Sequence, residues 1–284
     1  MAYPTIDAPY GYKPINLIGG QVFAGSTRMY PISYGYAVNL FYGDPVTIQT
    51  TSSGAAVAGT VVTQASAVST TNTIVGIFLG CSYTNPITKQ KQFAQYWPSG
   101  TLAGDAVAYV SDDPDAVFKA VACTAAGTAT VASVSALLVG QNVAGTTLTT
   151  AGSTATGNGA SGVVAASANA SGGGFRVFDI VADSQIETPC TYVSGATTTS
   201  LVVSGLTVGQ VIPVGTDVYQ IVGGQFQHIG SALTSAATVS SATSQTLTVV
   251  ASTVTPAASA QLVLVQNPEI LVKINFSAHR YYVA

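Results

Sequence analysis

The sequence predicts an all-β protein, with a β-barrel or β-sandwich base domain, Ser/Thr/Gly-rich β insertions and an extended N-terminal arm. Strong helix formers are scarce, whereas Val, Thr, Ile and Tyr recur and are punctuated by Gly. Apolar and polar residues alternate in short stretches, which is the period of a strand with one buried face. Turn signals such as Tyr42-Gly43-Asp44 and Asp112-Asp113-Pro114-Asp115 separate these stretches, as in sandwiches and barrels.

The expected strands follow one another along the chain. They are residues 45–50, 56–63, 73–79, 106–110, 116–122, 174–181, 200–203, 218–222, 245–251, 261–265 and 269–276. A Gly/Asp turn comes just before three Val-bearing strands, at Gly43-Asp44, Gly104-Asp105 and Gly215-Thr216-Asp217. Glycine permits a positive φ and the carboxylate can satisfy turn N–H groups, so we interpret the three units as ordinary β-turn chemistry.

Charge divides the chain into segments of different composition. Residues 120–175 hold no charged side chain, and residues 188–268 hold only Asp217. We therefore expect an extended arm over 1–40, a neutral Gly/Ser/Thr insertion over 123–173 and a small inserted β module over 188–266. The base domain is then assembled from residues 41–122, 174–187 and 267–284. The neutral insertion is interpreted either as short strands with long loops or as a disordered segment.

The composition disfavours several classes of function. Only 7% of residues are charged, against about 25% in an ordinary soluble domain, and a nearly neutral surface tolerates association with other subunits. No apolar run approaches the ~18–20 residues that cross a bilayer, so we expect no membrane partner. The eight basic residues are spread along the chain without a basic stripe, so we expect no nucleic-acid partner.

Residues that could carry catalysis or bind a metal are few. The chain has two histidines, His228 and His279, and its glutamates are Glu187 and Glu269. The three cysteines form no CxxC pair, and we expect each to be a small buried apolar residue; they are Cys81, Cys123 and Cys190. We therefore expect no catalytic residue, no metal site and no cofactor, and the chain is not expected to be an enzyme.

Two local motifs resemble ligand-binding loops. Residues 20–27 have the spacing of a phosphate-binding loop, but Ser26 stands where the decisive lysine would be, and Pro31 argues against a following helix. We interpret this stretch as a turn. Asp112, Asp113 and Asp115 could supply oxygen ligands to Ca²⁺, although the same run is typical of an exposed hairpin turn, which is the favoured interpretation.

Several segments resemble virion structural proteins of tailed phages, cyanophages and pelagiphages among them. The resemblance begins with residues 1–20, MAYPTIDAPYGYKPINLIGG. It continues through GIFLGCSYTNP (76–86), QYWP (95–98), AVAYVSDDPDA (106–116), FRVFDIVAD (175–183) and NPEILVKIN (267–275). It covers roughly residues 1–122 and 174–187 plus the C-terminal strand, whereas the segment 188–266 falls outside it and looks like an added module.

This resemblance implies a capsid decoration (cement) protein, a β-barrel or sandwich that is often trimeric and sits on the outside of the head shell. The implied partners are the major capsid protein and further copies of this chain. The implied location is the capsid surface of the virion, after synthesis in the host cytoplasm, because the start lacks the basic and apolar regions of a signal peptide. A major capsid protein, or another minor head or tail structural protein, is the alternative. The common capsid fold has a long spine helix, for which the sequence gives no signal.

The N-terminal arm is the predicted partner-binding segment. Prolines restrict its unbound conformations, which lowers the cost of ordering on docking, and its aromatic side chains supply contact area. We expect the exposed arm to include Tyr10 and Tyr12 in particular. The predicted partner-binding residues are Tyr3, Pro4, Tyr10, Tyr12, Lys13, Arg28 and Tyr30.

A second class of function is a carbohydrate- or host-surface-binding module displayed on the virion. The neutral Ser/Thr-rich β segments would then form the recognition surface, and such a surface needs exposed aromatic platforms. The aromatic residues available there are Tyr192, Tyr219 and Phe226.

Overall fold

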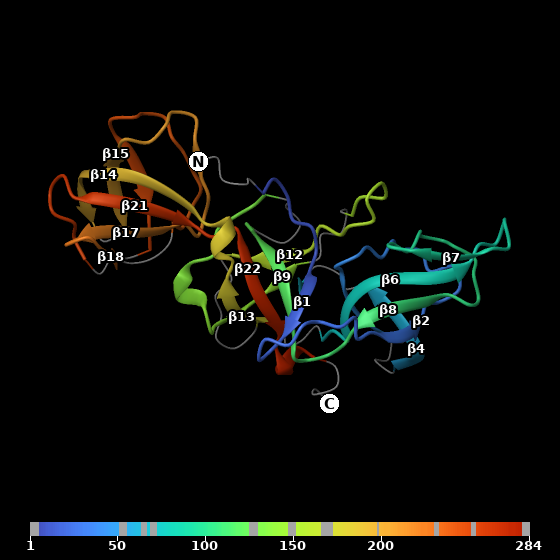
Figure 1. Ribbon diagram of the computed structural model, residues 1–284. Coiled ribbons are helices and arrows are strands. Elements are labelled where there is room, and N and C mark those ends of the chain that lie inside the picture. The colour runs from blue at the N-terminus through green and yellow to red at the C-terminus, as the bar shows by residue number, and fades with distance from the viewer. Residues whose placement is uncertain are drawn as a thin grey trace.

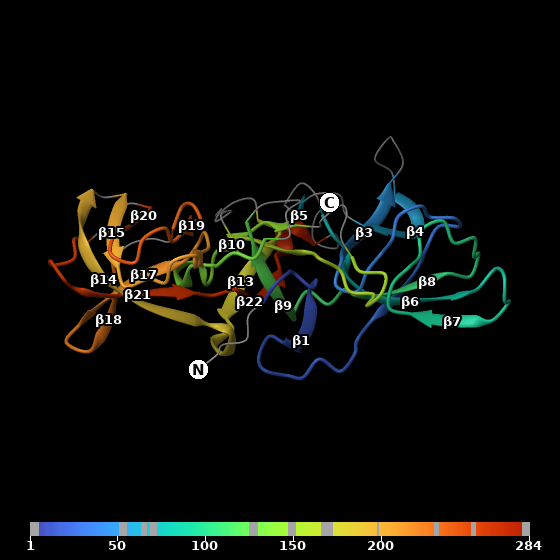
Figure 2. The same cartoon turned by 90° about the horizontal axis from the view of Figure 1, so that it is seen from above.

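The computed structural model describes residues 6–50, 56–63, 67–68, 73–124, 130–146, 152–165, 173–197, 199–229, 233–250 and 254–279. Three lobes lie in a row, and each has its own hydrophobic core (Figures 1 and 2). Nearly all regular structure in these residues is strand. The helical segments described are three single 3₁₀ turns: η1 (Ala136–Leu138), η2 (Ala182–Ser184) and η3 (Phe276–Ala278). The all-β prediction is confirmed.

The central lobe is built on an eight-stranded sheet with the order β10-β13-β22-β9-β12-β11-β5, to which β1 adds by pairing with β9. Its core gathers side chains from distant parts of the chain, including Phe118, Phe175 and Val272. The strands are β1 (Lys13–Leu17), β5 (Ala67–Val68), β9 (Ala116–Cys123), β10 (Asn142–Val143), β11 (Gly145–Thr146), β12 (Gly162–Val164), β13 (Phe175–Ile180) and β22 (Glu269–Ile274).

The β6 lobe lies at one end of the row and packs around Trp97, the only tryptophan of the chain. Its sheet has the order β2-β8-β6-β3-β4, and β7 pairs with β6. The strands are β2 (Arg28–Pro31), β3 (Pro45–Thr50), β4 (Ala56–Thr63), β6 (Gly76–Thr84), β7 (Lys91–Ala94) and β8 (Val107–Ser111).

The β14 lobe lies at the other end, with a core formed by residues between Cys190 and Leu264. A six-stranded sheet has the order β18-β17-β21-β14-β15-β20, and β16 pairs with β19. The strands are β14 (Ile186–Thr197), β15 (Ser200–Ser204), β16 (Val211–Ile212), β17 (Asp217–Val222), β18 (Gln225–His228), β19 (Ala237–Thr238), β20 (Gln245–Thr248) and β21 (Gln261–Gln266).

Every stretch predicted as a strand overlaps one in the structure, with bounds that shift by a few residues. The predicted strand 73–79 shows the largest shift, because β6 begins at Gly76 and continues to Thr84. Pairing explains the extension. Residues Cys81–Thr84 form a ladder with β7, a strand the sequence did not predict.

The N-terminal segment differs from the expected exposed arm. Tyr12 is fully buried in the central core, where its ring stacks on Phe175 with centroids 4.4 Å apart. Its hydroxyl donates to the carbonyl oxygen of Gly162 at 2.6 Å. The next residues form β1, which pairs with β9, so the expectation that Tyr12 lies exposed is wrong. Burial of an aromatic ring in the core removes its apolar surface from water and so stabilises the folded chain.

The described part of the neutral segment 123–173 forms short strands, which is one of the two interpretations of its sequence. Its described residues supply β10, β11 and β12 to the central sheet, and Val134, Val143 and Val163 are buried in the central core. Short strands can join a sheet without charged residues because main-chain hydrogen bonds do not depend on side-chain type. The residues predicted to form one base domain, 41–122, 174–187 and 267–284, contribute to two lobes that have separate cores.

Candidate interaction site

Tyr10 lies at the centre of a charged cluster on the central sheet. Its hydroxyl donates to Oε1 of Glu269, and Nζ of Lys119 lies 3.1 Å from the same oxygen. The Nζ of Lys13 lies 4.1 Å from the centroid of the Tyr10 ring, within cation–π range. We call these four residues (Tyr10, Lys13, Lys119 and Glu269) the Tyr10 cluster.

The strand register places the Tyr10 cluster. Lys13 of β1 lies directly opposite Lys119 of β9, and Glu269 at the start of β22 lies opposite Val121 of β9. Alternate residues of a strand share a face, so Lys119 and Val121 project on the same side of the sheet as Glu269. Tyr10 reaches this face because Gly11 follows it with φ +83°, a left-handed conformation that turns the chain before β1.

Burial shapes the electrostatics of the Tyr10 cluster. The pKa of Tyr10 is raised far above its usual range, first by burial and then by the hydrogen bond to Glu269, because an ionised phenolate would face a carboxylate. Tyr10 therefore stays a neutral donor. The Glu269 side chain is only 10% exposed, and it holds both a hydroxyl and an ammonium group. The arrangement fixes the N-terminal segment to the sheet and leaves the lysine charges at its rim.

The other predicted partner-binding residues have different positions. Arg28 is exposed, and its Nε lies 3.0 Å from Oδ2 of Asp112. Tyr30 is buried, and its hydroxyl donates to the same carboxylate at 3.0 Å. Tyr3 and Pro4 lie outside the described residues. Of the predicted set, the structure brings Tyr10 and Lys13 together with Lys119 and Glu269, two residues that the sequence reasoning missed. The alternation within 116–122 and 269–276 was the available signal for them.

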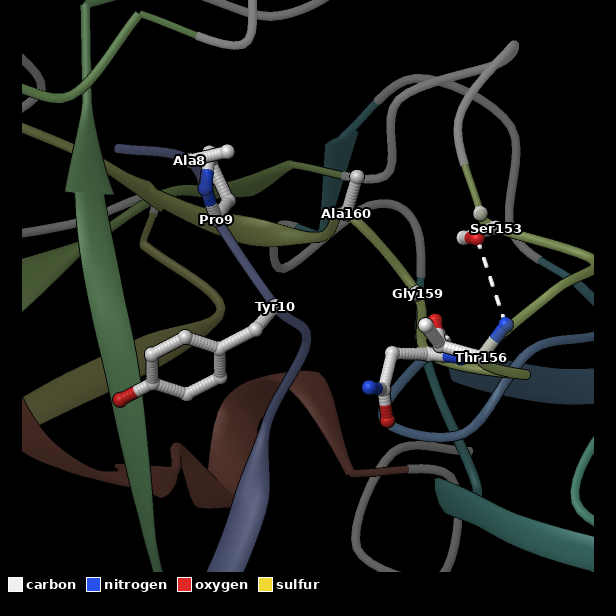
Figure 3. Close-up of a pocket in the computed structure, with 9 residues that line it drawn as sticks. Ala8, Pro9, Tyr10, Ser153, Thr156, Gly159 and Ala160 are labelled. Atoms are coloured by element: carbon white, nitrogen blue, oxygen red, sulfur yellow. Dashed lines mark hydrogen bonds between the residues drawn. The ribbon is translucent and has the colours of Figure 1, made fainter. Parts of the chain in front are cut away.

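A shallow pocket of about 440 Å³ lies beside Tyr10. Figure 3 shows Ala8, Pro9 and Tyr10 on one side and the loop with Ser153 and Thr156 on the other. The Tyr10 side chain points away from that loop, towards the sheet (Figure 3). The lining is otherwise made of small and uncharged residues, which provides no positioned acid–base group for catalysis.

A second pocket, of about 230 Å³, lies on the β14 lobe. It is lined by Tyr219 and Phe226, whose rings meet edge to face at 6.1 Å, together with Gln185, Glu187 and Val265. Phe226 is 56% exposed, whereas Tyr192, the third aromatic residue expected on this surface, is buried in the lobe core. The pocket therefore combines aromatic faces with one amide and one carboxylate.

Neither motif that resembled a ligand loop has the structure of one, and residues 20–27 are irregular chain with an isolated bridge between Val22 and Asn16. The stretch 20–27 leads into strand β2 and not into a helix. In the acidic run, Asp113 accepts from the backbone N–H of Asp115 at 2.9 Å, while the carboxylate of Asp112 holds Arg28 and Tyr30. The run is therefore a turn, as expected, but it is not a hairpin turn, because β8 and β9 on either side of it belong to different sheets and do not pair.

The three cysteines are buried thiols, as predicted. Burial raises the pKa of Cys81 and of Cys190 to about 12, so neither is a reactive thiolate at neutral pH. Over the described ranges, no group of three or more His, Cys, Asp or Glu residues is arranged to hold a metal ion. In the same part of the chain, no helix has the length and apolar character needed to span a membrane.

The chain was also compared with known proteins. No protein-family model, no curated protein and no solved structure matched it. The geometry and the sequence features described above therefore carry the functional interpretation.

Proposed function

We propose that this chain is a virion structural protein of a tailed phage, and specifically a capsid decoration protein that docks on the head shell and stabilises it. Its partners are the major capsid protein and further copies of itself, in a homotrimer on the capsid surface. The chain has no role as an enzyme in this proposal.

The observation that carries the proposal is where the resembling segments lie. The described parts of residues 1–122 and 174–187 and the C-terminal strand supply β1, β9, β13 and β22 of the central lobe, together with all strands of the β6 lobe. Segments that are far apart in the sequence but share the resemblance are thus joined in two neighbouring lobes. The β14 lobe, which falls outside the resemblance, has a core of its own. This division supports a docking body with an added module.

The surface supports a life in an assembly. With 7% charged residues, like-charge repulsion between copies is weak. Large apolar side chains are exposed along the N-terminal segment and the β6 lobe, at Val22, Met29, Tyr34, Ile87 and Phe93. Exposed apolar side chains of this size are typical of protein–protein contacts when they gather in patches.

The major-capsid alternative is less well supported. It requires a long spine helix, and the only helical elements in the described ranges are single 3₁₀ turns of three residues each. The features given above fit a minor head or tail structural protein equally well. The position of the chain in a density map of the particle, described below, distinguishes these roles.

A carbohydrate-binding role is the second candidate function, and the pocket of Tyr219 and Phe226 favours it. Aromatic faces can stack on the apolar faces of sugar rings, while Gln185 and Glu187 can bind hydroxyl groups. A glycan array probed with the wild-type chain and with Phe226→Ala tests this role. Binding that is lost in the variant supports it, and the absence of wild-type binding contradicts it.

The decoration role is tested on purified particles. We expect the chain to band with intact virions in a density gradient and to map to the outside of the head in a density map of the particle. Recovery from the lysate but never from particles would contradict the proposal. A position in the tail would support the alternative structural role. Light scattering across a concentration series should show a concentration-dependent trimer.

A further inference from the structure

Half of the chain's basic residues lie on one face of the central sheet. The chain has eight Lys and Arg residues, and four of them stand on the adjacent strands β1, β9, β22 and β13. Figure 1 shows these strands together in the middle of the molecule. We call the four side chains the cationic row: Lys13, Lys119, Lys273 and Arg176.

The strand register puts the cationic row together. Lys13 lies directly opposite Lys119, and Arg176 lies directly opposite Lys273. Lys119 also lies opposite Leu271, which is two residues before Lys273 on the same strand. Residues opposite one another, and residues two apart on one strand, share a face. The two pairs are therefore diagonal neighbours, and basic residues that are scattered in the sequence become one surface feature.

Each pair sets like charges against each other, which destabilises a sheet. Local contacts relieve part of this repulsion. Lys119 is paired with Glu269, the ammonium group of Lys273 lies 4.5 Å from the Phe276 ring, and Nε of Arg176 donates to the carbonyl oxygen of Gly140 at 3.0 Å. A chain with so few charges nevertheless keeps two such pairs side by side.

The edge of the cationic row has the composition of a protein interface. Arg176 is exposed, Phe276 is 47% exposed, and Phe178 of the same strand as Arg176 is 44% exposed. Arginine and aromatic residues are enriched at protein–protein interfaces.

We propose that the cationic row docks an acidic surface of a partner protein. This inference rests on the proposed function, in which the partner is a subunit of the shell. Two carboxylates share the face by register: Glu269, and Asp179 opposite Leu271. Phosphates of a nucleic acid would be repelled by both, and the net charge of the chain is −3. A protein surface can place its own acidic residues opposite the lysines and avoid these two positions.

The test compares two single substitutions that make the same change of charge. Lys273→Glu reverses a charge in the cationic row, whereas Lys89→Glu reverses an exposed lysine on the β6 lobe. The full chain and both variants are bound to head shells from which this chain has been removed. The same proteins are also bound to poly-L-glutamate and to duplex DNA, at several salt concentrations. We expect Lys273→Glu to weaken shell and polyglutamate binding about tenfold, with a flatter salt dependence, and Lys89→Glu to bind as the wild type does.

The outcomes separate this inference from the proposed function. Wild-type shell binding that Lys273→Glu and Arg176→Glu leave unchanged overturns the inference and leaves the decoration role standing. Wild-type binding to polyglutamate but not to shells, lost in Lys273→Glu, supports the cationic row and contradicts the decoration role. Tighter binding to duplex DNA than to polyglutamate overturns the choice of a protein partner. Far-ultraviolet circular dichroism of each variant excludes unfolding as the cause.

Discussion

At both junctions with the central lobe, an outer lobe presents a Gly/Asp turn, but the carboxylate serves different partners. At the β6 lobe, Asp44 accepts from the hydroxyl of Ser161 at 2.7 Å and from the backbone N–H of Phe41 at 3.0 Å. At the β14 lobe, Asp217 accepts from the backbone N–H of Ala136 at 2.7 Å and lies 3.3 Å from Nε2 of His228. One buried carboxylate has only neutral donors, and the other also has an imidazole.

The glycines of the two turns lie against different parts of the central lobe, as a Cβ atom placed on each of them shows. A Cβ on Gly43 would lie 2.7 Å from the backbone N of Tyr12, so this junction is closed through the N-terminal segment. A Cβ on Gly215 would lie 1.8 Å from the carbonyl oxygen of Ser133, so the β14 lobe meets the central lobe directly. The Gly/Asp turn occurs three times in the sequence, and at two of these places it packs an outer lobe against the central lobe.

The largest effect is expected from Gly215→Ala. The new Cβ would overlap a backbone oxygen, and Gly215 has φ +84°, so both the contact and the conformation are strained. We expect a loss of about 3 kcal/mol or more, in the form of weaker docking of the β14 lobe. Hydrogen exchange should quicken in residues 211–218 and 133–137. The fluorescence transition of Trp97, which is buried in the β6 lobe core, should stay in place.

Gly209→Ala is the matched control for this substitution. Gly209 lies in the same lobe with φ +86°, and a Cβ there meets nothing within 4 Å. It therefore carries the conformational strain without the overlap, and a cost of about 1–2 kcal/mol is expected. Equal losses for the two variants would show that close approach at the junction contributes nothing.

The next effect is the pH dependence at the other junction. Burial raises the pKa of Asp44 from 3.8 to about 6, and this outweighs the hydrogen bonds from Ser161 and Phe41, which lower it. Because the folded state binds this proton more tightly than the unfolded state, Asp44 contributes stability below pH 4. That contribution is lost as the pH rises through 6. The pKa difference corresponds to about 3 kcal/mol.

Asp44→Asn isolates this contribution, because an amide does not ionise. Relative to the variant, the wild-type chain should lose about 3 kcal/mol of unfolding free energy between pH 4 and pH 7. Denaturant unfolding followed by Trp97 fluorescence measures it, since this tryptophan lies in the lobe that Asp44 helps to dock. If the unfolding free energies of the two proteins changed in parallel with pH, Asp44 would not be protonated at this junction.

The positions of the strands could be predicted from the sequence far better than their pairing and their tertiary contacts. Alternating residues identified β9 and β22, because a half-buried strand has a period of two whatever its partners are. Among the described residues the longest strand is β14, and it was missed since Pro189 and Gly195 interrupt its pattern. Tyr12 was assigned to an arm because Gly and Pro lie close to it in the sequence. Phe175, on which its ring stacks, is 163 positions further along the chain, so the local sequence contains no sign of this contact. The cationic row depends in the same way on register between distant strands, which composition does not determine.

The smallest effect should come from the third Gly/Asp turn, which lies at no lobe junction. Asp105 accepts from the backbone N–H of Thr84 at 2.9 Å, from its hydroxyl and from Nζ of Lys91, and these contacts hold the pKa of Asp105 well below its usual range. The site is exposed, so solvent screens the ion pair. Asp105→Asn should quicken hydrogen exchange in residues 84–94 and move the Trp97 transition less than ionisation of Asp44 moves it in the wild-type chain between pH 4 and pH 7. If Asp105→Asn moved that transition more, a Gly/Asp turn would stabilise the protein to the same degree wherever it lies, and its position at a lobe junction would not matter.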